Sequence, residues 1–115
     1  MGRLIYLLPL AVLLYLWWTR RSARTGDLKA LLDRGAQVLD VRTRAEFTGA
    51  AHPRAIHIPL DQLAARLEEL DRHRPVLVCC ESGSRSGLGV ALLKRAGFKE
   101  VANLGPWRRI HDLLA

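Results

Sequence analysis

Residues 75 to 86 read PVLVCCESGSRS, and this stretch gives the clearest indication of the fold. Its first part, Pro75 to Cys79, is apolar on both faces, which is typical of a central strand in a parallel sheet. A polar segment containing Gly83 follows. It leads into a run from Ser84 to Ala96 with helical spacing, which Gly97 ends. A buried strand, a tight loop and a helix in this order predict one unit of an α/β protein.

Outward from this unit, short apolar strands alternate with helical segments along the chain. The expected strands cover residues 37–41, 55–58, 75–79 and 100–102. The expected helices cover residues 27–34, 43–47, 61–70, 84–96 and 107–114, with Thr43 and Asp61 as N-terminal caps. The alternation predicts a small parallel α/β sheet with helices on both faces.

The segment from Leu4 to Trp18, LIYLLPLAVLLYLWW, carries no charge. A membrane-spanning helix needs about 20 residues, with a lower limit of roughly 17, and the flanking residues bring this segment to that limit. A cleaved signal peptide is one alternative, but only Arg3 precedes the apolar run and no small-residue cleavage site follows it. A buried helix of a soluble protein is another. We expect one uncleaved transmembrane helix in an anchor over residues 1–24, followed by one domain over residues 25–115.

The chain has a net charge of +7, and part of the basic excess flanks the apolar segment. More arginines follow this segment than precede it, so the positive-inside rule places the domain in the cytoplasm. That reducing compartment would keep cysteines as thiols. A nucleic-acid-binding surface needs a basic stripe with interleaved aromatic residues. The sequence has no such stripe, so we expect no nucleic acid as a partner. The apolar segment makes a membrane an expected partner.

The two cysteines, Cys79 and Cys80, are adjacent. A vicinal pair makes a poor structural disulfide, because the peptide between the two residues strains the bridge. No CxxC or Cys/His spacing indicates zinc, and we expect neither a metal nor a cofactor. Side chains alternate across a strand, so the two thiols should face opposite sides of the sheet. We expect Cys79 to lie in the core; a resolving thiol that serves Cys80 is the alternative.

The loop that begins at Cys80 follows a buried strand and opens a helix. Ligands of open α/β sheets bind at the carboxyl ends of the strands. Backbone N–H groups of such a loop, together with the helix N-terminus, can stabilise an anion, and a Cys80 thiolate would thereby become a nucleophile. Gly83 permits a tight loop, and the planar cation of Arg85 suits a bidentate grip on an oxyanion. The alternative is a buried structural cysteine followed by an ordinary polar turn. It explains less well why Cys80, Gly83 and Arg85 occur together between a strand and a helix.

From Cys80 to Ser86 the pattern Cys-x-x-Gly-x-Arg-Ser resembles the active loop of the rhodanese family. Other matches follow the family order: Leu39-Asp40-Val41-Arg42, Glu46-Phe47, His52, Ala55-Ile56, Ile58-Pro59, Ala96-Gly97-Phe98 and Asn103-Leu104. The resemblance covers about residues 27 to 115. Two segments depart from the family pattern: residues 51–55 are one residue shorter than usual, and residues 104–107 are compressed. Both affect the expected pocket rim, and neither removes the loop.

The resemblance implies a sulfurtransferase, and the apolar segment of residues 4–18 would anchor it to a membrane. Cys80 would take sulfane sulfur from a donor such as thiosulfate, hold it as a persulfide, and pass it to a thiol or cyanide. The resemblance makes Cys80 catalytic and assigns substrate binding to Glu81, Ser82, Gly83, Ser84, Arg85 and Ser86. It also places Asp40, Arg42 and His52 in supporting positions, where a structural ion pair is the favoured role of Asp40 and Arg42. The Glu81 carboxylate would oppose an anionic donor unless it points outward.

Two other functions remain open. One is a non-catalytic binding or regulatory module at the membrane, because a fold alone does not fix a function. The presence of Cys80 favours the enzyme over this alternative. The second is a phosphatase or an arsenate reductase. In related phosphatases of this fold, the loop between cysteine and arginine is one residue longer. The shorter loop between Cys80 and Arg85 counts against it.

Overall fold

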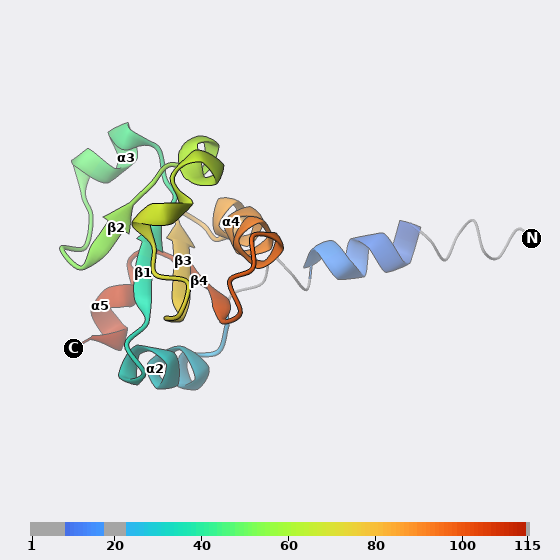
Figure 1. Cartoon of the computed structure of the whole chain (residues 1–115), viewed down its shortest axis with the longest axis horizontal. Coiled ribbons are helices and arrows are strands. Elements are labelled where there is room, and N and C mark those ends of the chain that lie inside the picture. Colours follow the sequence, from blue (N-terminus) through green and yellow to red (C-terminus); the bar gives the residue numbers. More distant parts are fainter. Residues whose placement is uncertain (1–8, 18–22, 115) are drawn as a thin grey trace, which may run out of the picture.

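The computed structural model describes residues 9–17 and 23–114. A four-stranded parallel sheet with strand order β2-β1-β3-β4 forms the centre of this part of the chain (Figure 1). The strands are β1 (Gln37–Asp40), β2 (Ala55–His57), β3 (Val76–Cys80) and β4 (Val101–Pro106). All residues of β3 are buried, as its continuous apolar run predicted.

Helices cover both faces of the sheet, as predicted. They are α2 (Thr25–Asp33), α3 (Arg44–Gly49), α4 (Ser84–Arg95) and α5 (Arg109–Leu113), with the 3₁₀ segments η1 (Leu60–Ala65) and η2 (Leu67–Glu69). Helices α2 and α5 pack on one face, in a core cluster that contains Leu28, Val38, Leu77, Cys79, Leu104 and Ile110. Helix α4 and segment η1 pack on the other face, in a cluster that contains Leu39, Leu63, Val78, Cys80, Val90 and Leu93.

The two cysteines lie on opposite faces of β3, as strand alternation predicted. Helix α4 approaches β3 closely at Gly89, where a Cβ atom would lie 3.1 Å from Val78 Cγ1. Helix α4 begins at Ser84, four residues after β3 ends at Cys80. The loop between Cys80 and Ser84 is therefore held between two rigid elements.

One predicted element was wrong. An α-helix was expected over residues 61–70, but the structure has the two 3₁₀ segments η1 and η2. Asp61 is no cap, because η1 starts one residue earlier and Pro59 precedes it. The Leu60 N–H donates to Val41 O, which fixes this turn against β1, and the following bonds span three residues, as from Arg66 N to Leu63 O. Docking against the sheet thus outweighs helix propensity here.

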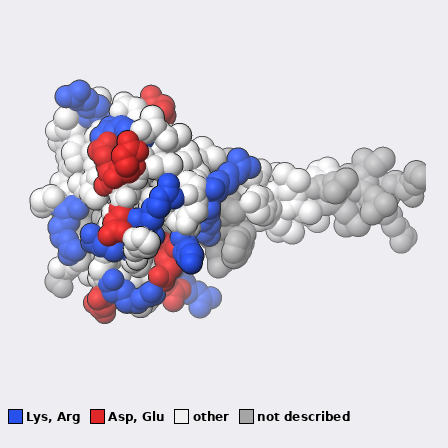
Figure 2. All heavy atoms as spheres, in the orientation of Figure 1, with Lys and Arg blue, Asp and Glu red and all other residues white. Residues whose placement is uncertain are grey.

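The described N-terminal residues, 9–17, are helical, and most of their large apolar side chains are exposed, including Leu13 at 63%. Figure 2 shows this uncharged segment projecting from the charged surface of the domain. Within the described residues, no helix has both the length and the apolar character needed to cross a bilayer. Residues 1–8 and 18–22 of the expected anchor lie outside the described part of the chain.

Candidate active site

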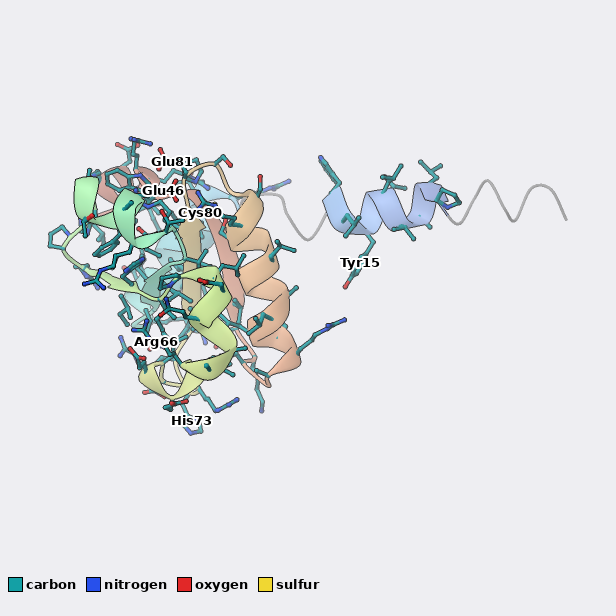
Figure 3. All side chains as sticks on the ribbon, turned by 90° about the horizontal axis from the view of Figure 1, so that it is seen from above. Tyr15, Glu46, Arg66, His73, Cys80 and Glu81 are labelled. Carbon is teal, nitrogen blue, oxygen red and sulfur yellow. The ribbon has the colours of Figure 1, made fainter. Side chains whose placement is uncertain are left out.

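Cys80 is the last residue of β3 and has 0% of its surface exposed. Figure 3 shows it at the same end of the molecule as Glu46 and Glu81, with His73 at the opposite end. The Gly83 N–H donates to Cys80 Sγ at 2.9 Å. Gly83 has a φ of 107°, a conformation that other residues rarely adopt, and this aims its N–H at the sulfur.

Hydrogen bonds favour the thiolate form of Cys80. Burial raises the pKa of this thiol, but the Ser86 hydroxyl and the backbone N–H groups of Ser86, Gly83 and Ser82 lower it by more, so the pKa lies below its ordinary value. Burial on the other face of the strand raises the pKa of Cys79 far above the ordinary value. Of the two thiols, Cys80 is therefore the one whose surroundings favour the thiolate, the form of cysteine that acts as a nucleophile.

Arg85 points to helix α3. Its guanidinium donates to both carboxylate oxygens of Glu46, at 2.6 and 2.9 Å. Glu46 also closes the predicted capping box with Thr43 at the start of α3. The expected grip of Arg85 on a donor is therefore occupied by a carboxylate of the protein itself. The sequence reasoning noted Glu46 as a family match but gave it no role in the site.

The ion pair with Arg85, followed by hydrogen bonds from Thr43, lowers the pKa of Glu46 to about 2. A lowered folded-state pKa stabilises the protein fully above the unfolded-state pKa, and this contribution is lost as pH falls toward 2. We therefore expect Glu46→Gln to reduce the free energy of unfolding at pH 6, with a deficit that shrinks as pH falls from about 5 to 3. Urea unfolding of both proteins across this range measures the deficit. A deficit independent of pH would contradict the ion-pair explanation.

Asp40 and Arg42 form a buried ion pair at the end of β1, with 2.9 Å between Arg42 Nη2 and Asp40 Oδ2. Arg42 Nη2 also donates to Ala50 O at 2.7 Å, and its guanidinium lies 4.5 Å from the ring centroid of Trp107. These contacts tie β1 to the segment before β2 and to the end of β4. They agree with the structural role that the sequence favoured for this pair.

Glu81 points away from the sulfur. Its carboxylate accepts from Arg108 Nη1 at 2.8 Å and from Arg42 Nη1 at 3.3 Å. The ion pair with Arg108, followed by that with Arg42, lowers the pKa of Glu81. Two guanidinium groups therefore balance the carboxylate that seemed to oppose an anionic donor. No sequence motif indicated Arg108.

Three other predicted site residues, Ser82, Ser84 and His52, make their side-chain hydrogen bonds with groups other than Cys80 Sγ. The Ser82 and Ser84 hydroxyls lie 3.4 Å apart on the exposed side of the loop. His52 Nδ1 accepts from the Arg54 N–H at 3.1 Å, and its ring packs edge-on against His111. Burial, then His111 and Arg54, lower the pKa of His52. The structure does not bring His52 to the loop.

Asn103 is the main residue that the site assignment missed. It lies on β4 and is 4% exposed, and its side-chain amide contacts both Ser86 and Gly83 O of the loop. The family match at Asn103-Leu104 was the available signal. Among the described residues, no group of three or more His, Cys, Asp or Glu side chains could hold a metal ion.

The strand, loop and helix around Cys80 correspond to a known domain. The sequence pattern of the rhodanese-like domain matches residues 25–105. This chain belongs to the rhodanese-like domain family. The structure of a rhodanese-like domain protein from Staphylococcus aureus superimposes with a TM-score of 0.64 at 29% identity, over 76% of this chain and 88% of that one.

Two proteins similar to this chain are named as a sulfurtransferase and as a putative sulfur carrier protein. Thiosulfate sulfurtransferase 18 of Arabidopsis thaliana is 34% identical over 101 residues, covering 73% of this chain and 72% of that protein. The putative sulfur carrier protein YrkF of Bacillus subtilis is 36% identical over 77 residues, which cover 67% of this chain. The match spans only 42% of YrkF. These similarities support sulfurtransferase chemistry of the rhodanese type.

Proposed function

We propose that this rhodanese-like domain transfers sulfane sulfur from a donor such as thiosulfate, through a persulfide on Cys80, to a thiol or cyanide. One observation carries the proposal: Cys80 Sγ accepts a hydrogen bond from the Gly83 N–H, and hydrogen bonds with Ser86, Gly83 and Ser82 lower the pKa of this thiol. The same donors can stabilise the terminal charge of a persulfide. The name of the Arabidopsis relative supports thiosulfate as a donor.

The proposed reaction has two balanced steps. In the first, the Cys80 thiolate attacks the outer sulfur of thiosulfate, the S–S bond of the donor breaks, and sulfite leaves with the bonding electron pair. In the second, an acceptor thiolate attacks the outer sulfur of the Cys80 persulfide, and the Cys80 thiolate is regenerated. Each step exchanges one S–S bond for another, as in thiol–disulfide exchange, so no external oxidant or reductant is needed.

Charges at the rim of the loop bear on the choice of donor. The Arg85 guanidinium is held by Glu46, and that of Arg108 by Glu81. Arg108 is the more exposed of the two arginines, with 62% of its side chain accessible. An anionic donor would therefore bind Arg108 in place of Glu81, because this exchange requires less movement of side chains than the displacement of Glu46 from Arg85. Because Cys80 has no exposed surface, the donor also requires side chains at the rim to move.

The test is to incubate the full-length chain in detergent with thiosulfate and to measure its intact mass and the sulfite released. We expect the gain of one sulfur atom per chain with one equivalent of sulfite, and return to the original mass after addition of glutathione. A folded chain that takes up no sulfur from thiosulfate or from glutathione persulfide would overturn the proposal. It would then favour the non-catalytic module.

We also propose that residues 4–18 anchor the chain in a membrane, with the domain on the cytoplasmic side. The uncharged run, the arginines that follow it and the exposed apolar side chains of residues 9–17 support this placement. The full-length chain should stay with membranes through alkaline washing and be released by detergent, and protease should reach the domain only from the cytoplasmic side. Recovery of the chain in the wash would contradict it.

A further inference from the structure

The carboxylate of Glu81 joins two arginines beside the active-site loop. Its Oε1 accepts from Arg108 Nη1 at 2.8 Å, and its Oε2 accepts from Arg42 Nη1 at 3.3 Å. Glu81 follows Cys80 directly in the chain and lies at the same end of the molecule (Figure 3). The Trp107 N–H, next to Arg108 in the chain, donates to Cys80 O at 2.8 Å. The fold therefore holds this group of charges next to the nucleophile.

The charge of Glu81 acts in the same region as that of Cys80. The pKa of Arg85 is raised first by the hydrogen bond with Glu46. The charges of Cys80 and Glu81 raise it further, so one guanidinium interacts with both negative groups. A free anion that approaches Cys80 therefore enters a region in which the Glu81 carboxylate repels it.

Arg42 keeps its place without Glu81. Its side chain is 2% exposed and donates to both carboxylate oxygens of Asp40. It also donates to the backbone oxygens of Glu46 and Ala50. These bonds remain when the Glu81 carboxylate moves or is replaced. Arg42 is therefore a fixed, buried cation rather than a group that a sulfur donor can reach.

Arg108 is the cation that a sulfur donor can reach. Its side chain is 62% exposed, and its guanidinium lies 4.8 Å from the ring centroid of Trp107. A guanidinium that packs against an aromatic ring keeps the N–H groups along its edge for hydrogen bonds. Glu81 accepts from one of these groups, at Nη1. An anion at Arg108 must displace this carboxylate or bind beside it, and the negative charge of Glu81 opposes the anion in both cases.

We propose that Glu81 is a specificity-determining residue: by pairing with Arg108, it lowers the reactivity of Cys80 toward small anionic sulfur donors relative to uncharged ones. Its role in the choice of donor rests on the proposed sulfur transfer through Cys80. Thiosulfate carries two negative charges, so its binding at Arg108 competes with Glu81. A sulfane-sulfur donor without a charge near the reacting sulfur avoids this competition.

Two alkylating reagents of similar size measure this selectivity directly. Iodoacetate carries a negative charge and iodoacetamide carries none, and both attack the Cys80 thiolate with loss of iodide. The ratio of their rates on the full-length chain in detergent, in a Cys79→Ala background, is independent of the thiolate fraction and of the opening of the buried site. We expect Glu81→Gln to raise the ratio of the iodoacetate rate to the iodoacetamide rate about two- to fivefold, as for the loss of an exposed ion pair.

Substitution of Arg108 separates pairing from simple repulsion by Glu81. If Glu81 acts by occupying Arg108, Glu81→Gln should raise the ratio much less in an Arg108→Gln background. Equal increases in both backgrounds would overturn the proposal, because Glu81 would then act without Arg108. An unchanged ratio in Glu81→Gln and in Glu81→Ala, with the fold intact by circular dichroism, would also contradict it.

Glu100→Gln serves as the control for the loss of one carboxylate. Glu100 is exposed to a similar extent as Glu81, 41% against 39%, and is also held by an exposed arginine, Arg34. Glu100 directly precedes β4, whereas Cys80 ends the parallel strand β3, so the two lie at opposite ends of the sheet. Glu100→Gln should therefore leave the ratio unchanged.

The same variants test the role of Glu81 in the choice of donor. Glu81→Gln should lower the KM for thiosulfate by about the factor by which it raises the alkylation ratio. An unchanged KM in a chain that transfers sulfur would overturn this role. A shifted alkylation ratio in a chain that takes up no sulfur would instead overturn the proposed function and leave the charge selectivity of Cys80 in place.

Discussion

Cys80→Ser is expected to abolish sulfur loading and to lower sulfur transfer from thiosulfate by at least about a thousandfold, whereas Cys79→Ala should change the rate only a few fold. A serine hydroxyl stays protonated at neutral pH, and its oxygen cannot form a persulfide. Cys79 is fully buried on the opposite face of β3, with a raised pKa, so it has neither access nor charge for the reaction. Intact mass after incubation with thiosulfate and the rate of sulfite release measure both variants.

The two cysteine variants control for one another. Each replaces one buried side chain of β3 with a small one, so thermal unfolding shows whether a lost activity reflects a lost fold. A sulfur adduct that disappears in Cys79→Ala but persists in Cys80→Ser would place the chemistry on the wrong face of the sheet. That result would contradict the site described here.

The sequence alone predicted the sheet and the place of Cys80 at the end of its central strand, because the signals for both are local. The apolar run before Cys80 predicted a buried parallel strand, and Gly83 marked the turn that aims an N–H at the sulfur. The segment over residues 61–70 was misread for the opposite reason. Its leucine spacing suits an α-helix, but its shape depends on contacts with β1 that the local pattern does not contain.

The ion-pair partners of the charged side chains could not be predicted from the sequence either, because each pair joins residues that are far apart in the chain. Arg85 and Glu46 are 39 residues apart, and Arg108 and Glu81 are 27 apart, so no periodicity joins them. The place of Asn103 beside the loop depends on the register of β4 against β3, which includes an irregularity next to Val78. Only the fold brings these groups together, and it turns the two carboxylates toward arginines rather than toward the sulfur.

Replacing Arg42 with methionine should give the largest loss of stability, roughly 3–5 kcal/mol in the free energy of unfolding. Arg42 has 2% of its side chain exposed and Asp40 has 1%, so the substitution leaves a carboxylate buried without its counter-charge. Ala50 O would lose the guanidinium donor as well. Urea denaturation of the full-length chain in detergent, followed by far-ultraviolet circular dichroism, measures the loss.

The matched control is Arg34→Met. Arg34 also grips a carboxylate with two hydrogen bonds, that of Glu100, but its side chain is 59% exposed. Water compensates both charges when such a pair is broken, so we expect a much smaller loss of stability than for Arg42→Met. The difference between the variants therefore reports the cost of leaving the Asp40 carboxylate buried and unpaired, together with the loss of the Arg42 contacts with Ala50 O and Glu81. Equal small losses would mean that the buried Asp40 carboxylate does not depend on Arg42, and would contradict the prediction.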